Sequence, residues 1–175
     1  MSTPNMNIEQ ELQESAKTAK AAMLFPAGEK PYLDKALEIA KANTKLGVQR
    51  LKLLTASAMY NEEILKNDQN TIEGLILAVP WFSQAPNAKT FIKAASNQWG
   101  TGMVSWRTAT SYDATQAFIQ ALSPNASRST VLKALQNVNL PASATSGDAL
   151  QFQNGERQIQ PILVKVENGQ FKFLQ

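Results

Sequence analysis

The sequence has neither cysteine nor histidine among its 175 residues. Protein zinc sites are built mainly from these two residue types, and cysteine nucleophiles and Ser-His-Asp triads require one or the other. These chemistries are therefore excluded, and no other metal-ligand cluster or cofactor motif replaces them. We expect no catalytic residue, no metal site and no cofactor, and hence a protein that is not an enzyme.

Charge and long apolar runs are also scarce. Charged residues make up 18% of the chain, and the 17 basic ones form no run of four or more, so we expect no nucleic-acid binding. The longest apolar stretches, such as Gly74 to Phe82, are too short to span a bilayer. The first seven residues have no basic region followed by an apolar run, so we expect no signal peptide in this chain.

Short apolar runs alternate with amphipathic segments through the first half of the chain. This alternation is typical of buried parallel strands joined by right-handed helical crossovers. The spacing predicts helices over 8–19, 32–44 and 61–66, and strands over 21–25, 49–55 and 75–79. Ligands bind such sheets at the carboxyl ends of the strands, which here are Phe25–Gly28, Thr55–Tyr60 and Pro80–Phe82.

Helical patterns dominate residues 86–137. We expect helices over 86–99, 108–122 and 128–137, and Ser127 is a candidate N-cap for the third. The middle helix is expected to turn one apolar face inward, formed by Ala114, Ala117, Phe118, Ala121 and Leu122.

Two Asn-Gly pairs, Asn154-Gly155 and Asn168-Gly169, are favoured two-residue hairpin turns near the C-terminus. In the second hairpin we expect Val164 opposite Phe173 and Val166 opposite Phe171, with Lys165 and Lys172 together on a wet face. Those pairings follow from the period of two in a strand.

Three groups of polar or aromatic residues have both a structural and a functional interpretation. Glu62 and Glu63 are neighbours on a helix, so their side chains diverge and are expected to stabilise its start rather than to catalyse. Asp113 is expected in the first turn of its helix, with a general base as the alternative. Trp81 is either a core residue or an aromatic wall of a ligand cleft.

Three segments, in order, resemble a known family. They are Glu73–Phe82, Ser105–Ala117, and Phe152–Arg157 followed by Pro161–Phe171. Together they resemble the C-terminal half of type I periplasmic solute-binding proteins. The most similar group is the branched-chain amino acid and amide receptors of ABC importers, especially cyanobacterial members.

This resemblance implies an α/β, Rossmann-like, three-layer parallel sheet of the periplasmic-binding-protein type I fold, incomplete and with a C-terminal β-hairpin. It implies that residues 1–82 belong to the C-terminal lobe, 83–146 are helices of the N-terminal lobe, and 147–175 hold the last crossing and the hairpin. Roughly the first half of a family member is then expected to be absent. The full-length protein is expected in the periplasm, working with the membrane subunits of an ABC importer.

The resemblance also implies a small-molecule ligand that is amino acid-like or amide-like. Ser57 stands about where the amino acid receptors place a carboxylate for the ligand ammonium, so an ammonium group would lack its charge partner here. The candidate ligand-binding residues lie after the first, second and third strands: Phe25, Pro26, Ser57, Met59, Tyr60 and Trp81.

The residues also allow other functions to be considered. An enzyme would need a nucleophile or base poised by a partner, and no such motif is present. A ligand-sensing or self-associating domain of the same fold, without a transport role, is the alternative to a receptor. Removing a lobe would expose apolar surface on residues 86–138, which favours a homodimer of the isolated chain.

Overall fold

The chain forms two compact units in the computed structural model, which describes residues 7–66, 69–100 and 104–174. Unit 1 consists of residues 1–79 and 163–175, and unit 2 of residues 80–162. The chain therefore passes between the units at 79/80 and again at 162/163. The assignment of residues 1–82 to the C-terminal lobe, 83–146 to the N-terminal lobe and 147–175 to the last crossing and the hairpin stays a prediction. The boundaries between the units lie elsewhere because Trp81 bonds to Ser146 within unit 2, and residues 150–153 pair with residues 139–140 and 156–157 of the same unit.

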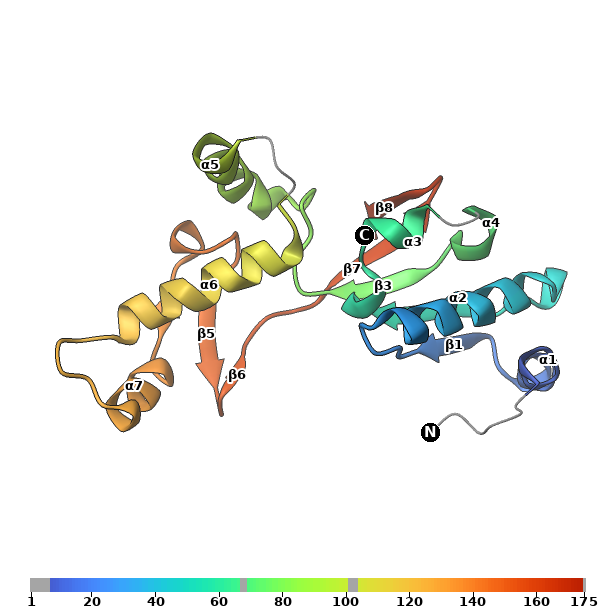
Figure 1. The fold of residues 1–175 in the computed structure, drawn as a ribbon, viewed down its shortest axis with the longest axis horizontal. Coiled ribbons are helices and arrows are strands. Elements are labelled where there is room, and N and C mark those ends of the chain that lie inside the picture. The colour runs from blue at the N-terminus through green and yellow to red at the C-terminus, as the bar shows by residue number, and fades with distance from the viewer. Residues whose placement is uncertain (1–6, 67–68, 101–103, 175) are drawn as a thin grey trace. The chain divides into compact units, whose positions relative to one another are not determined.

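Unit 1 alternates helices and strands as the sequence predicts (Figure 1). Its first helix is capped by the Asn7 side chain, which accepts a hydrogen bond from the Gln10 N–H. Apolar side chains at helical spacing pack this helix against the second one and the residue before the second strand. The elements, in chain order, are α1 (Ile8–Thr18), β1 (Ala21–Leu24), α2 (Lys30–Thr44), η1 (Gly47–Gln49), β2 (Lys52–Ala56), η2 (Ser57–Met59), α3 (Glu62–Leu65), α4 (Gln69–Ile72) and β3 (Ile76–Val79).

A five-stranded sheet in the order β1-β2-β3-β7-β8 forms the centre of unit 1, where β7 is Ile162–Glu167 and β8 is Gln170–Phe173. Strands β1, β2 and β3 are parallel, with Leu24 opposite Thr55 and Thr55 opposite Leu77. The α/β fold class and the C-terminal hairpin are thus confirmed. Leu77 and Val79 are fully buried, as expected for continuous apolar strands of a covered sheet.

The hairpin β7–β8 has the predicted register, with Val164 opposite Phe173 and Val166 opposite Phe171. Asn168 and Gly169 both have positive φ, at 53° and 70°, the conformation that a two-residue hairpin turn requires. On the outer face Lys165 donates a hydrogen bond to Glu167. This bond and the ammonium charge hold the pKa of the Glu167 carboxyl below its ordinary value.

Unit 2 packs three main helices and a small three-stranded sheet in the order β4-β5-β6. Ser127 caps the third helix as predicted, by accepting from the Thr130 N–H. The buried apolar cluster of unit 2 joins its last two helices to the sheet. It consists of Ala117, Ala121, Val138, Leu140 and Leu150. The elements are η3 (Pro86–Ala88), α5 (Lys89–Trp99), α6 (Trp106–Ala121), α7 (Arg128–Leu135), β4 (Asn139–Leu140), η4 (Ala142–Ala144), β5 (Leu150–Gln153) and β6 (Glu156–Arg157).

The predicted inner face of α6 is wrong for three of its five residues. Ala117 and Ala121 are buried, but Ala114 is exposed, Phe118 is 48% exposed and Leu122, which follows the helix, is 57% exposed. The buried face instead runs through Ala109, Asp113, Ala117 and Ala121, at a spacing of four residues. Because the carboxylate of Asp113 has partners inside unit 2, it turns this face inward and leaves Phe118 and Leu122 outside.

Candidate functional site

The carboxyl ends of the paired parallel strands β1 and β2 lie side by side at one edge of the unit 1 sheet. The Thr55 hydroxyl donates to the Leu24 carbonyl at 2.9 Å, which ties the two strand ends together. Phe25 and Pro26 follow β1, and Ser57 follows β2, so parallel pairing brings these residues to the same edge. Phe25 is 72% exposed, so its ring is accessible to a ligand at this edge.

The turn after β2 divides its residues between the surface and the core. Ser57 is half-buried, and its carbonyl accepts the Tyr60 N–H at 3.0 Å. Met59 is fully buried in the interior of the unit, beneath the edge. The Tyr60 ring packs edge-on against Phe171 of β8 at 4.7 Å between ring centroids, so the hairpin helps to fix its direction.

Trp81, the candidate after β3, belongs to unit 2. Its indole N–H donates to the Ser146 carbonyl at 3.0 Å, and its side chain packs edge-on against Phe91. Trp81 is 4% exposed. The structure therefore brings Phe25, Pro26 and Ser57 together at one edge, and gives Trp81 defined partners inside unit 2.

Asp113 is not in the first turn of its helix, as predicted, but in its third turn. The helix begins earlier because Ser105 caps it by accepting from the Thr108 N–H. Asp113 is 1% exposed and pairs with Arg157 of β6 at 2.7 Å. This ion pair was not predicted, because residues 44 positions apart carry no local signal of pairing.

The guanidinium carbon of Arg107 lies 4.6 Å from the centre of the Trp106 ring. This is a cation–π contact within one turn of α6. Within the part of the chain that the structure describes, no group of three or more acidic side chains is placed to hold a metal ion.

A sequence model described as periplasmic binding protein matches residues 14–170. The chain belongs to this family. No curated protein sequence matches the chain. Over the residue ranges described above, none of the helices of this periplasmic binding protein combines the length and apolar character needed to cross a membrane.

Solved structures of ABC-transporter binding proteins share its fold. A leucine-binding protein from Thermotoga maritima is 16% identical with a TM-score of 0.77; the match covers 100% of this chain and 49% of that one. A substrate-binding protein from Sphaerobacter thermophilus is 14% identical, with a TM-score of 0.71 and coverage of 99% and 48%. A solute-binding protein from R. palustris, solved with benzoate, is 16% identical, with a TM-score of 0.66 and coverage of 99% and 48%. The chain thus spans about half the length of these relatives.

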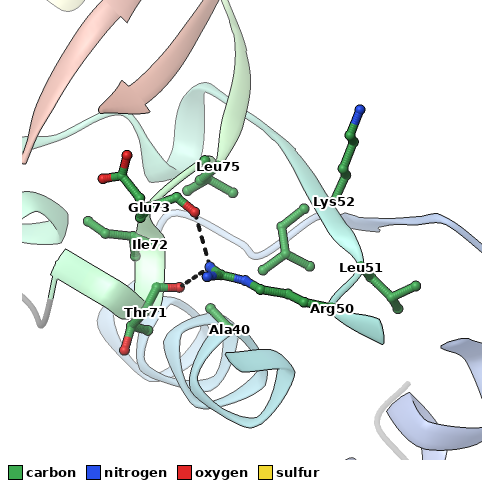
Figure 2. Close-up of a pocket in the computed structure, with 10 residues that line it drawn as sticks. Ala40, Arg50, Leu51, Lys52, Thr71, Ile72, Glu73 and Leu75 are labelled. Carbon is green, nitrogen blue, oxygen red and sulfur yellow. Dashed lines mark hydrogen bonds between the residues drawn. The ribbon is translucent and has the colours of Figure 1, made fainter. Parts of the chain in front are cut away.

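A pocket of about 200 Å³ lies in unit 1 of this family member, at the edge opposite to Phe25 and Ser57. Figure 2 shows the Arg50 guanidinium donating to the carbonyls of Thr71 and Glu73, at 3.3 and 3.0 Å. Thr71 lies in the last turn of the short helix α4, and Glu73 follows that helix before β3. Leu51 and Leu75 contribute apolar side chains to the pocket wall. Arg50 therefore has a structural role at the amino ends of β2 and β3.

A second pocket, of about 380 Å³, lies within unit 2 of this periplasmic binding protein. Its wall includes Phe91 and Tyr112, whose rings are 4.9 Å apart, and loop residues Ser143, Thr145 and Gly147. This pocket was not predicted from the sequence, because its wall comes from three segments that lie 18 to 30 residues apart in the chain. A cluster of aromatic residues near a Ser- and Thr-rich loop was the only available signal.

Proposed function

We propose that this chain is part of the solute-binding component of an ABC importer and contributes one wall of a small-molecule site. The observation that carries the proposal is the exposed aromatic ring of Phe25 beside Ser57, at the carboxyl edge of parallel strands. Ligands bind at this edge in open α/β sheets. Pro26 and Tyr60 lie at the same edge, and Met59 supports it from below.

The ligand class follows from the chemistry of this edge. An aromatic ring and a hydroxyl suit a ligand with an apolar body and an uncharged polar group, such as an amide-like or amino acid-like compound. The relatives include a leucine-binding protein and a protein in complex with benzoate, so the family fold accommodates both aliphatic and aromatic ligands. Because Ser57 carries no charge, an amide is the preferred candidate over a free amino acid.

NMR titration tests the site directly, because it detects binding in the millimolar range that one wall of a site would give. A panel of leucine, a branched-chain amide and benzoate is added to the ¹⁵N-labelled chain. We expect one compound to shift the amide resonances of Phe25, Ser57 and Tyr60 selectively. If all three compounds leave these resonances unchanged, the proposed site is wrong.

Phe25→Ala is expected to weaken that binding about tenfold, since removing a buried aromatic contact costs about 1.5 kcal/mol or more. Val48→Ala is the matched control, because Val48 is also an exposed apolar residue but lies in η1, before the amino end of β2. Equal weakening by both variants would show that the contact is non-specific.

We also propose that the full-length protein acts in the periplasm with the membrane subunits of the importer. This proposal rests on the family membership and on the transporter relatives. Co-purification of the full-length protein with an importer encoded beside it, in a ligand-dependent manner, would support it; transport that is unchanged when the gene is deleted would contradict it.

A self-associating domain is the second candidate, favoured by exposed apolar side chains on unit 2. Phe118 and Ile119 of α6 are 48% and 62% exposed, Leu122 directly after α6 is 57% exposed, and Leu132 of α7 is 60% exposed. A helix that is apolar on more than one face is typically covered on more than one face. We propose that two copies of this chain associate in solution and that each covers these four exposed side chains of the other.

Light scattering across a concentration series tests this association. The double variant Phe118→Ser/Leu122→Ser is expected to raise the dimer dissociation constant at least about tenfold, because each buried side chain contributes about 1–2 kcal/mol. Phe173→Ser, which alters a similarly exposed residue of β8 in unit 1, serves as the control. A parent chain that stays monomeric at high concentration would refute the dimer.

A further inference from the structure

The buried carboxylate of Asp113 is bonded on both of its oxygens. Oδ1 accepts the Ser146 backbone N–H at 2.6 Å, and Oδ2 accepts the Ser146 hydroxyl at 2.9 Å. Oδ2 also pairs with Nη2 of Arg157 at 2.7 Å. A carboxylate is costly to bury unless it is paired and hydrogen-bonded, and these three contacts meet that requirement. The helix α6 is thereby fastened to the loop that holds Ser146 and to β6.

Ser146 passes this constraint on to Trp81. Its N–H and hydroxyl are bonded to Asp113, while its carbonyl accepts the Trp81 indole N–H at 3.0 Å. Ser146 is 2% exposed, so water does not compete for these bonds. One peptide segment of a loop is thus held from both sides, by a carboxylate on one and by an indole on the other.

Trp81 has few other means of being oriented. It lies in the irregular segment between β3 and η3, where no strand ladder fixes its backbone. Its remaining ring contact is edge-on to Phe91, at 6.1 Å between centroids, which restrains the ring but does not fix the direction of its N–H. The hydrogen bond to Ser146 supplies that direction, and buried, fully paired polar networks specify geometry in this way.

We propose that Asp113 is a positioning residue for Trp81. The carboxylate fixes Ser146, and the Ser146 carbonyl fixes the indole in the segment by which the chain leaves β3. A hydrophobic residue at position 113 could fill the same space, but it would leave the Ser146 N–H without a partner and the Ser146 carbonyl free to turn. Any effect on ligand binding rests on the proposed function, whereas the positioning itself is independent of ligand.

The test uses the full chain with Trp99→Phe and Trp106→Phe, so that Trp81 is the only tryptophan. In this background Asp113→Asn is expected to displace Trp81, because the added amide N–H₂ opposes the guanidinium of Arg157. The expected results are a red-shifted emission, a rise in acrylamide quenching and loss of the hydrogen-bonded indole N–H resonance. All are measured without ligand, at a temperature where circular dichroism shows a folded chain.

Val138→Ala is the matched control, because Val138 is buried in unit 2 and belongs to its apolar cluster. It should lower the unfolding midpoint while leaving all three Trp81 signals as in the parent. A folded Asp113→Asn variant with parental Trp81 signals would overturn the proposal and leave Asp113 a purely structural residue. If Asp113→Asn does not fold, Asp113→Leu/Arg157→Leu decides, because it removes the carboxylate and leaves no unpaired guanidinium: greater quenching of Trp81 supports the proposal, and unchanged quenching overturns it.

Discussion

Gly147→Ala is expected to lower the free energy of unfolding of unit 2 by about 3 kcal/mol, from backbone strain and close contact together. Gly147 has φ of 144°, which side-chain-bearing residues rarely adopt. An added Cβ would also lie 2.7 Å from the carbonyl oxygen of Asn87 and 2.9 Å from its carbon. Both atoms belong to backbone, and the Asn87 side chain is further tied to Asp148, so the contact cannot be relieved cheaply.

Urea denaturation followed by tryptophan fluorescence measures this effect. The three tryptophans, Trp81, Trp99 and Trp106, all lie within residues 80–162, so their emission reports on unit 2. Gly155→Ala is the control, because Gly155 also has positive φ but nothing lies within 4 Å of its added Cβ. It should cost only about 1 kcal/mol. Equal losses for the two variants would show that the contact with Asn87 does not matter.

Asn43→Ala is expected to destabilise unit 1 by about 3 kcal/mol, because it leaves two buried backbone groups without partners. The Asn43 side chain is fully buried near the end of α2. Its amide donates to the Leu51 carbonyl at 2.9 Å, and its oxygen accepts the Leu51 N–H at 3.0 Å. Leu51 immediately precedes β2, so this pair of bonds joins the helix to the start of the strand.

Far-UV circular dichroism during urea denaturation is the suitable measurement, since the tryptophans do not report on unit 1. Thr44→Ala provides the control one residue along the helix. The Thr44 hydroxyl bonds only to the nearby Lys41 carbonyl, so its loss should change stability by about 0.5 kcal/mol or less. A loss for Asn43→Ala no larger than that would mean that water replaces the side chain at Leu51.

Local chemistry made parts of the fold predictable. The Asn168-Gly169 turn made the register of β7 and β8 predictable to the residue, because a two-residue turn with positive φ at both positions allows one pairing. Ser127 was identified as a helix cap from its position alone. Continuous apolar runs located β1 and β3 within one residue, because strands covered on both faces have that composition.

The face of α6 shows where such prediction stops. Apolar residues occur around most of this helix, so periodicity favoured Phe118 and Leu122 inside, whereas the structure leaves both half-exposed. The candidate site was likewise predictable only in part. Strand order could place Phe25 and Ser57 at one edge, because parallel strands share an edge, but could not show that Met59 turns inward.

The sequence by itself determined the α/β class, the strand ends that form the candidate site and the absence of thiol and imidazole chemistry. These follow from composition and from patterns a few residues long. Only the tertiary structure decided that Asp113 is buried against Ser146 and Arg157, and that Trp81 bonds to the loop at Ser146. Those partners are 33 to 65 residues apart, and no local propensity selects one distant partner over another. Burial selects the partner of Asp113, because an unpaired carboxylate in the interior is too costly to remain.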